Sequence, residues 1–242
     1  MHDNLPLVSI VTPNYNYANF ISETIESVLN QDYSKIEYII VDDGSTDNSV
    51  EVIQTYVIRN PEKIKLIQQV NMGQTPAINA GLREVKGDIV GWINSDDLYY
   101  DNNAISAIVN GFKDNPDCDI IFGDYRLINE EGKTIKYVKQ LEMDRVMGAC
   151  IGFGILSSSN TVFWKSGLFK TVGYLKEDLI YNMDGEYWSR LMLAGKAKHI
   201  PVFIADFRWH TNAKTVKNQG VNVTPRFRFE FEYEIKRSYS KL

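Results

Sequence analysis

The sequence predicts an α/β protein in which helices flank a mostly parallel central sheet, with a smaller mixed region in the second half of the chain. Two observations carry this prediction. In the first hundred residues, short aliphatic runs alternate with segments of helical periodicity, and polar residues follow each run. Unbroken apolar runs are typical of strands buried on both faces. The strand–helix–strand order implies right-handed crossovers between parallel strands.

The individual elements follow from these patterns. The aliphatic runs predict strands at residues 7–11, 36–41, 64–67 and 89–93. Apolar stripes at helical spacing predict helices at about 20–29, 50–57 and 74–85. The second half is expected to contain a helix at 101–112, a hairpin of 120–128 and 134–138, a strand at 161–164, a helix at 184–194 and a strand at 198–204. Beyond Pro225, aromatic residues alternate with charges, which fits either a strand or an amphipathic helix.

The composition is that of an ordinary globular protein, with 44% hydrophobic and 24% charged residues among 242. The net charge of −5 argues against nucleic-acid binding, which needs clustered Lys and Arg. No apolar run approaches the roughly 20 residues that span a bilayer, and the N-terminus lacks a basic or apolar leader. Cys118 and Cys150, the only cysteines, form neither a disulfide framework nor a zinc–thiolate motif. We therefore expect a cytoplasmic protein.

Acidic residues follow two of the predicted strands, at the edge where parallel sheets bind their ligands. Asp96 and Asp97 follow the fourth strand. Adjacent carboxylates repel each other unless a positive charge compensates, and hard oxygen ligands suit Mg²⁺ or Mn²⁺. The pair therefore indicates a metal site. The alternative is that one Asp caps the helix that follows and the other is solvated.

Asp42 and Asp43 form a second pair, after the second strand, and lead into turn-forming residues. Turn and capping preferences account for Gly44 and Ser45, but not for two carboxylates. A carboxylate here can accept hydrogen bonds from a nucleobase or a ribose, whereas it repels phosphate. The strand ends contain no glycine-rich phosphate loop and no lysine. A nucleotide bound there would need a metal ion to neutralise its diphosphate.

Four segments, in this order along the chain, resemble the inverting family 2 glycosyltransferases of GT-A fold. They are TPNYN from Thr12, VDDGSTDNS from Val41, NMGQTPAINAGL from Asn71 and GDIVGWINSDD from Gly87. Residues 160–191 are similar to the acceptor half of bacterial members, so the resemblance covers roughly residues 5–211. It implies one GT-A (Rossmann-like) domain over 1–211, with a nucleotide-sugar half at about 1–110 and an acceptor half at about 111–211. A tail at 212–242 follows, for which a helix is one option.

The resemblance also implies roles for residues on the donor side. Asp43 would bind the base of the nucleotide. Ser95-Asp96-Asp97 corresponds to the DxD-type motif of the family, with Ser95 where the first Asp often lies. Asp97 would then be the main metal ligand, and Asp96 would lie nearer the ribose or diphosphate. The remaining expected substrate-binding residues are Thr12, Pro13, Tyr15, Asn71, Gly73 and Ser95.

Two further residues are assigned near the reacting groups. His210 lies where some members of the family have a histidine that contacts the metal or the diphosphate, and the alternative is an edge-strand imidazole that faces water. Asp184 matches the catalytic base of the family, although Met183 stands where an acidic residue often precedes it. Independently, Asp184 and Trp188 share a helical face. Partial desolvation there would raise the pKa of the carboxyl and help it to accept a proton. The alternative is that Asp184 is a helix N-cap.

These assignments predict transfer of a sugar from a nucleotide-diphosphate sugar, with a UDP-sugar favoured, to an acceptor hydroxyl with inversion. The cofactor would be Mn²⁺ or Mg²⁺. The acceptor would be a saccharide or a lipid-linked saccharide, and the resemblance implies a bacterial cell-envelope or exopolysaccharide pathway. Basic and aromatic residues in the C-terminal tail could associate with the inner face of a membrane, although interleaved glutamates weaken that expectation.

Three alternatives compete with this function. A non-catalytic sugar-nucleotide-binding protein would account for the departures at Ser95 and Met183. A sugar-phosphate nucleotidyltransferase would share the layout but needs a glycine-rich basic loop after the first strand, which is absent. A haloacid-dehalogenase-like phosphatase needs an Asp-x-Asp motif, whereas Asp42 and Asp43 are adjacent.

Overall fold

One nine-stranded sheet runs through the described part of the chain, which is residues 5–142, 158–179 and 183–211 of a computed structural model. The strands are β1 (Val8–Asn14), β2 (Ile36–Asp42), β3 (Ile64–Gln68), β4 (Ile89–Trp92), β5 (Leu98–Tyr99), β6 (Ile120–Ile128), β7 (Thr134–Val138), β8 (Val162–Lys165) and β9 (Ala197–Arg208). The helices are α1 (Ile21–Leu29), α2 (Ser49–Arg59), α3 (Gln74–Leu82), α4 (Ala104–Asp114), α7 (Phe169–Val172) and α8 (Met183–Ala194), with 3₁₀ turns η1 (Ser159–Thr161) and η2 (Ser166–Leu168). The expected tail at 212–242 lies outside the described residues.

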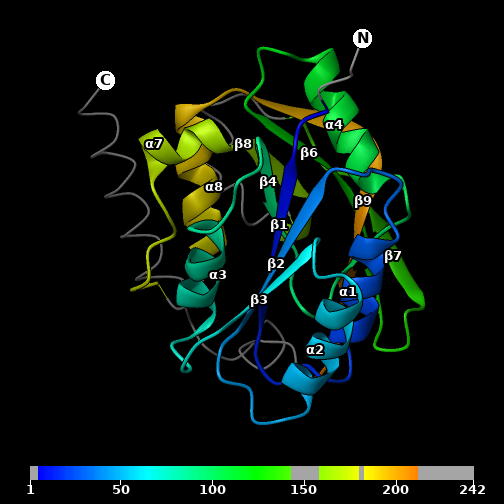
Figure 1. Cartoon of the computed structure of the whole chain (residues 1–242). Helices are drawn as coiled ribbons and strands as arrows, with labels where there is room; N and C mark the ends of the chain where they lie inside the picture. The colour runs from blue at the N-terminus through cyan, green and yellow to red at the C-terminus, as the bar shows by residue number, and fades with distance from the viewer. Residues whose placement is uncertain (1–4, 143–157, 180–182, 212–242) are drawn as a thin grey trace, which may run out of the picture.

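The strand order confirms the α/β fold with its mostly parallel sheet. The order is β3-β2-β1-β4-β8-β6-β9-β5, with β7 paired to β6. Strands β1 to β4 are parallel neighbours, β8 runs antiparallel between β4 and β6, and β9 is parallel to β6. Helices α3, α7 and α8 lie on one side of the sheet, and α1, α2 and α4 lie on the other (Figure 1). The antiparallel insertion of β8 marks the start of the mixed second half.

Two hydrophobic cores, one on each face of the sheet, explain why the central strands read as unbroken apolar runs. Alternate residues of a strand point to opposite faces. In β2, Tyr38 and Ile40 belong to the core under α1, α2 and α4, while Ile39 and Val41 belong to the core under α3 and α8. All four side chains are fully buried. A strand covered on both faces has no polar side, and hence no alternating pattern.

Two features of the sheet differ from the sequence-based expectation. The short strand β5 was not expected, and β9 continues to Arg208, whereas the expected strand ended at residue 204. Charged residues near the end of β9 are buried. Asp206, one of them, forms a bidentate pair with Arg126, with a distance of 2.8 Å between Nε and Oδ1. The extension carries the chain to the edge of the sheet where Asp97 lies.

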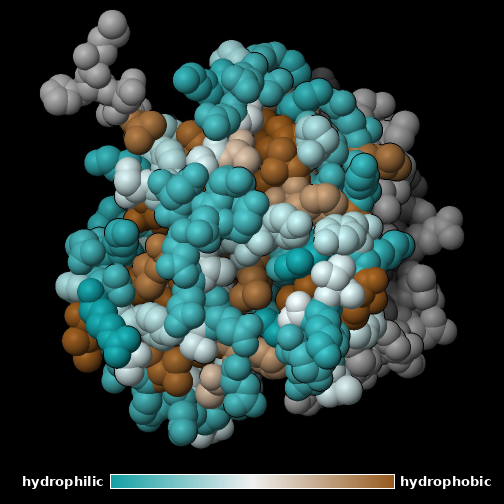
Figure 2. Space-filling model, turned by 90° about the vertical axis from the view of Figure 1, so that its right-hand side faces the viewer, coloured by the Kyte–Doolittle hydropathy of each residue, from teal (hydrophilic) through white to brown (hydrophobic). Residues whose placement is uncertain are grey.

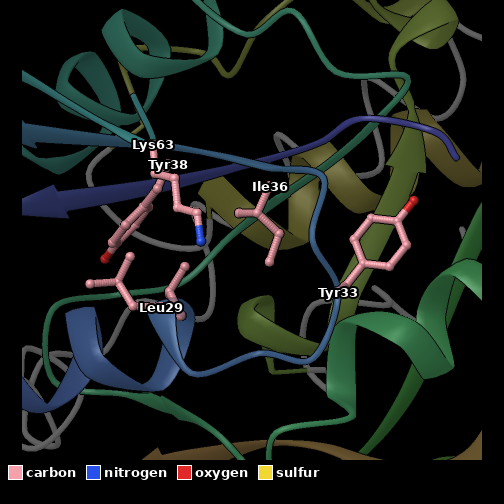
Figure 3. A pocket seen from close by; sticks show the side chains of 6 residues that line it. Leu29, Tyr33, Ile36, Tyr38 and Lys63 are labelled. Atoms are coloured by element: carbon pink, nitrogen blue, oxygen red, sulfur yellow. The ribbon is translucent and has the colours of Figure 1, made fainter. Parts of the chain in front are cut away.

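A small cavity lies at the opposite end of the sheet. Val28, Leu29, Tyr33, Ile36, Tyr38 and Lys63 line it, near the start of β2 and β3 (Figure 3). It has room for about 10 Å³, which accommodates one water molecule at most. It is therefore too small for a substrate.

Among the described residues, no helix is both long and apolar enough to cross a membrane. Figure 2 shows the side of the molecule that lies on the right in Figure 1, where hydrophilic residues predominate and hydrophobic ones form separate patches. Scattered exposed hydrophobic side chains of this kind are normal for protein surfaces.

The turn after β2 contains a glycine, Gly44, that the backbone conformation requires. Gly44 has φ = +73°, and a Cβ there would lie 2.8 Å from the backbone nitrogen of Asn71. Gly44→Ala is expected to lower the free energy of unfolding by about 2–4 kcal/mol, because left-handed strain and a backbone clash add together. Gly132→Ala is the matched control, since Gly132 has φ = +77° with open space around it. If urea unfolding gives the same loss of unfolding free energy for Gly44→Ala and Gly132→Ala, the contact with Asn71 does not contribute.

Candidate active site

One buried carboxylate joins the loops that follow β1 and β2. The parallel register places Asn14 beside Asp42 at the ends of these strands. Asp42, 1% exposed, accepts hydrogen bonds from Asn14 Nδ2 (2.8 Å), Ser45 Oγ (2.6 Å) and Ser45 N (3.0 Å). The Ser45 hydroxyl in turn accepts a hydrogen bond from the backbone of Asn16. Ser45 thus fixes the two loops against each other and does not cap α2, whose N-cap residue is Asn48.

The second carboxylate of this pair organises the loop between β3 and α3. Asp43 Oδ1 accepts hydrogen bonds from Gln69 Nε2 (2.7 Å) and Met72 N (2.9 Å), and Oδ2 accepts one from Gly73 N (2.7 Å). The residue is only 2% exposed. A carboxylate has about four acceptor positions, so Oδ2 can accept one more donor. The expected role of Asp43 in binding the base stays a prediction, and holding Gly73 in place is an additional role.

The Asn94–Asp97 loop after β4 is tied to three other elements. Ser95 Oγ donates to the carbonyl of Pro13 (2.7 Å), at the end of β1. The hydroxyl of Thr24 in α1 contacts the carbonyl oxygens of Ser95 and Asp97, at 2.9 Å each. Gln74 Nε2, at the start of α3, donates to Asn94 Oδ1 (3.2 Å). Segments that are far apart in sequence therefore meet at one edge of the sheet.

The two carboxylates of this loop have different environments. Asp97 is 1% exposed, and its carboxylate accepts hydrogen bonds from Arg208 N (2.9 Å) and Asn94 Nδ2 (3.1 Å). Burial raises the pKa of Asp97 well above its usual range, and the charge of Asp96 raises it further. The Asp96 side chain is 14% exposed, with Oδ2 3.0 Å from His210 Nε2. The assignment of Asp97 as the main metal ligand stays a prediction, and both oxygens of its carboxylate already accept hydrogen bonds from the protein.

His210 is buried among aromatic rings rather than exposed on an edge strand. Its side chain is 1% exposed, with ring centroids 5.9 Å from Tyr17 and 4.9 Å from Phe20. Its Nδ1 is buried and has no hydrogen-bond partner among the described residues. Tyr17 hydrogen-bonds Asp96, and burial together with the charges of Asp96 and Asp97 raises the pKa of its hydroxyl. Tyr17 therefore stays protonated and can donate to Asp96.

Asp96 Oδ2 and His210 Nε2 lie within hydrogen-bond distance of each other. Two ligands at about 2.1 Å from an octahedral ion lie about 3 Å apart, which matches the separation of Asp96 Oδ2 and His210 Nε2. In the part of the chain that the structure describes, no group of three or more His, Cys, Asp or Glu side chains could hold a metal. An ion here would need ligands from water or from substrate phosphates, as Mg²⁺ and similar ions commonly do.

Asp184 reaches the same end of the sheet on α8. Residues 195 and 196 alone separate α8 from β9, so the first turn of α8 lies at the end toward which β9 runs. One turn along, Trp188 stacks on Trp92 of β4, with ring centroids 4.5 Å apart and planes at 19°. Asp184 is half-buried, and its Oδ1 accepts a hydrogen bond from Gly185 N (2.9 Å). Its catalytic role stays a prediction.

The remaining predicted residues divide between the interior and the surface. Thr12 is fully buried, with its hydroxyl 3.0 Å from the hydroxyl of Tyr38, and its expected role in substrate binding stays a prediction. Pro13 is buried next to the Asn94–Asp97 loop. Tyr15 is 43% exposed, and Asn71 is exposed. Of these four residues, Tyr15 and Asn71 therefore offer open side chains.

Three residues at this site were missed by reasoning from the sequence. Thr24 gave a weak signal, since it is a polar residue within the apolar stripe of α1. Tyr17 gave none, because its exposure depends on how the β1 loop folds back onto Asp96. Arg208 is two residues from His210 and is 1% exposed. Burial of a charged side chain cannot be recognised without its partners.

The chain is similar to glycosyltransferases in sequence and in structure. The profile of glycosyl transferase family 2 matches residues 9–177. An uncharacterized glycosyltransferase of Rickettsia felis is 30% identical over 223 residues, which is 90% of this chain but 36% of that protein's length. S. aureus TarS 1–349 in complex with UDP-GlcNAc superposes with a TM-score of 0.77 at 20% identity, over 96% of this chain and 66% of TarS 1–349.

A further structural neighbour is the mannosyltransferase PcManGT from Pyrobaculum calidifontis, in complex with GDP-Man and Mn²⁺. It superposes with a TM-score of 0.65 at 19% identity, over 85% of this chain and 57% of that chain. At these identities the structural likeness shows the fold, which is the GT-A fold expected from the sequence. The profile match covers more than half of the chain. The chain therefore belongs to glycosyl transferase family 2.

Proposed function

We propose that this chain transfers a sugar from a nucleotide-diphosphate sugar to an acceptor hydroxyl with inversion. A UDP-sugar is the favoured donor, and the acceptor is a saccharide or a lipid-linked saccharide. The observation that carries the proposal is the contact between Asp96 and His210 at the ends of parallel strands. No lysine or arginine stands in the loops at 12–16, 42–47, 69–73 and 94–97. An anionic diphosphate at this edge needs a cation from outside the loops.

Asp96 and His210 would hold that cation, Mn²⁺ or Mg²⁺. When bound, the ion would neutralise the diphosphate and stabilise it as a leaving group. Support comes from the 3.0 Å contact, from the 14% exposure of Asp96, and from the complex of the structural neighbour PcManGT with GDP-Man and Mn²⁺. Asp97 would hold the loop through Arg208 and Asn94. This assignment moves metal binding from Asp97, where the resemblance implied it, to Asp96.

Asp184 would act as the general base. A half-buried carboxylate on the first turn of α8 could take the proton of the acceptor hydroxyl, whose oxygen would then attack the anomeric carbon from the face opposite the leaving diphosphate. A single displacement of this kind inverts the configuration, as water does in inverting glycosidases. The Trp92–Trp188 stack supports the assignment, because it fixes α8 against the strand that leads to Asp96.

The first test is a thermal-shift screen of UDP-, GDP-, TDP- and CDP-sugars with and without Mn²⁺. One nucleotide class is expected to raise the unfolding temperature by about 5–10 °C at a hundredfold excess over its dissociation constant. The shift should require Mn²⁺, because the loops at this edge contain carboxylates but no lysine or arginine to neutralise the diphosphate. Stabilisation that is equal with EDTA would contradict the metal-dependent donor site. Metal-dependent donor hydrolysis would distinguish an enzyme from a sugar-nucleotide-binding protein.

The second test decides between the two carboxylates. In calorimetry with the donor that the screen selects, Asp96→Asn and His210→Ala are each expected to weaken Mn²⁺-dependent binding by at least about 10–100-fold. Asp97→Asn keeps the shape of the side chain and serves as the comparison. If Asp97→Asn removes the metal dependence while Asp96→Asn retains it, the sequence-based assignment of Asp97 as the direct ligand is correct and ours is wrong.

The third test concerns the base. Asp184→Asn is expected to lower the transfer rate by about 10²–10⁴-fold while donor affinity is unchanged, because the amide cannot accept the proton. Rates measured from pH 5 to 9 should lose the limb that reports deprotonation of the base. A variant with near-normal turnover would identify Asp184 as a helix cap.

A further inference from the structure

We propose that Arg208 is a positioning residue that holds both cation ligands, Asp96 and His210, in the arrangement required for binding. The proposal rests on the function proposed above and extends it to a residue that would contact neither the ion nor the donor. It starts from an unusual environment, since a guanidinium that is 1% exposed needs partners for its N–H groups.

The side chain of Arg208 connects three elements. Its Nε donates to the carbonyl of Asp96 (2.9 Å), and Nη1 donates to the carbonyl of Glu130 (2.6 Å), in the turn between β6 and β7. Nη2 contacts Glu23 Oε2 of α1 at 2.6 Å. The guanidinium carbon lies 5.0 Å from the centre of the Phe20 ring, a cation–π geometry. The Asn94–Asp97 loop, α1 and the β6–β7 turn are therefore held by one planar group.

The backbone of Arg208 adds a fourth connection. Its N–H donates to Asp97 Oδ1 (2.9 Å). The same residue thus contacts the carbonyl of one aspartate and the carboxylate of the next. His210 follows two residues later on the same segment. The hydrogen bonds of Arg208 to Asp96 and Asp97 therefore fix the position of the Asn94–Asp97 loop relative to the segment that carries His210.

The charge of Arg208 suits this place. Asp96 and Asp97 are adjacent, and their mutual repulsion would open the loop when no cation is bound. The guanidinium lies against this loop, since its Nε donates to the carbonyl of Asp96. It also presents three donors in a fixed fork, whereas a lysine ammonium would reach these acceptors one or two at a time. Asp96 and His210 can thus be preorganised before the ion arrives.

The test distinguishes a residue that positions the metal ligands from a residue that only stabilises the fold. Arg208→Met removes the fork and the charge, while Arg208→Lys keeps the charge but loses the fork. Arg126→Met is the matched control. It removes another guanidinium of the same sheet, which hydrogen-bonds Asp206 and Thr134 rather than Asp96 or Asp97 in the described part of the chain.

The measurement is the affinity for Mn²⁺ in the presence of UDP, from the electron paramagnetic resonance signal of free Mn²⁺, on the full chain. Unfolding temperatures without metal are recorded alongside. Arg208→Met is expected to weaken Mn²⁺ binding by about 10–100-fold, the usual effect of losing a residue that supports metal ligands. Arg208→Lys should fall between this variant and the wild type. Arg126→Met should bind Mn²⁺ within about twofold of the wild type, even if its unfolding temperature falls.

Wild-type Mn²⁺ affinity in folded Arg208→Met overturns the proposal. If Arg208→Met does not fold, wild-type affinity in Arg208→Lys overturns it instead. An equal loss in Arg126→Met overturns it as well, because the effect would then reflect general destabilisation. If the wild type itself shows no Mn²⁺-dependent binding of UDP, the proposed cation site fails and Arg208 loses this role with it. Normal wild-type binding with unaffected variants refutes the role of Arg208 alone.

Discussion

The need to hydrogen-bond buried carboxylates determines how the loops at the ligand-binding edge of this sheet are arranged. Asp42, Asp43 and Asp97 are at most 2% exposed. A buried carboxylate without partners costs several kcal/mol or stays protonated. Each of the three takes at least one hydrogen bond from a distant segment, namely the end of β1, the β3–α3 loop and the end of β9. Few other arrangements of these loops would satisfy all three side chains.

The same requirement separates two neighbouring aspartates. In an extended or turning backbone, adjacent side chains point in different directions. Asp97 turns inward, where the backbone of β9 provides a donor, and Asp96 is left beside His210 with partial access to solvent. At this edge a partly exposed carboxylate therefore lies against a buried imidazole, among loops without lysine or arginine. Such an edge attracts a cation and repels a free diphosphate, which is the electrostatic basis of the proposed donor site.

Helix α8 is held near this edge by an aromatic core beside β4. Trp188 of α8 stacks on Trp92 and packs at 5.6 Å against Trp164, which forms an aromatic core next to β4. The indole nitrogens of Trp164 and Trp188 are buried without partners in the described part of the chain, so these two rings contribute packing rather than hydrogen bonds. Upstream of α8, the side chain of Asn79 in α3 bonds both the N–H and the C=O of Leu175. A candidate base on α8 is thus placed by the core of the first half of the chain.

The sequence by itself determined the α/β class, the order of the main elements and the edge at which the site lies, because periodicity and buried apolar runs are local properties. It also identified Asp96, Asp97 and His210 as candidates. It could not determine which of the adjacent aspartates turns inward, that Thr12 faces Tyr38, or that β9 extends through Asp206 to Arg208. Those outcomes depend on partners at least 26 residues away in sequence. Only the tertiary structure brings these partners together, because burying a charged or polar side chain is favourable only where distant segments satisfy its hydrogen bonds.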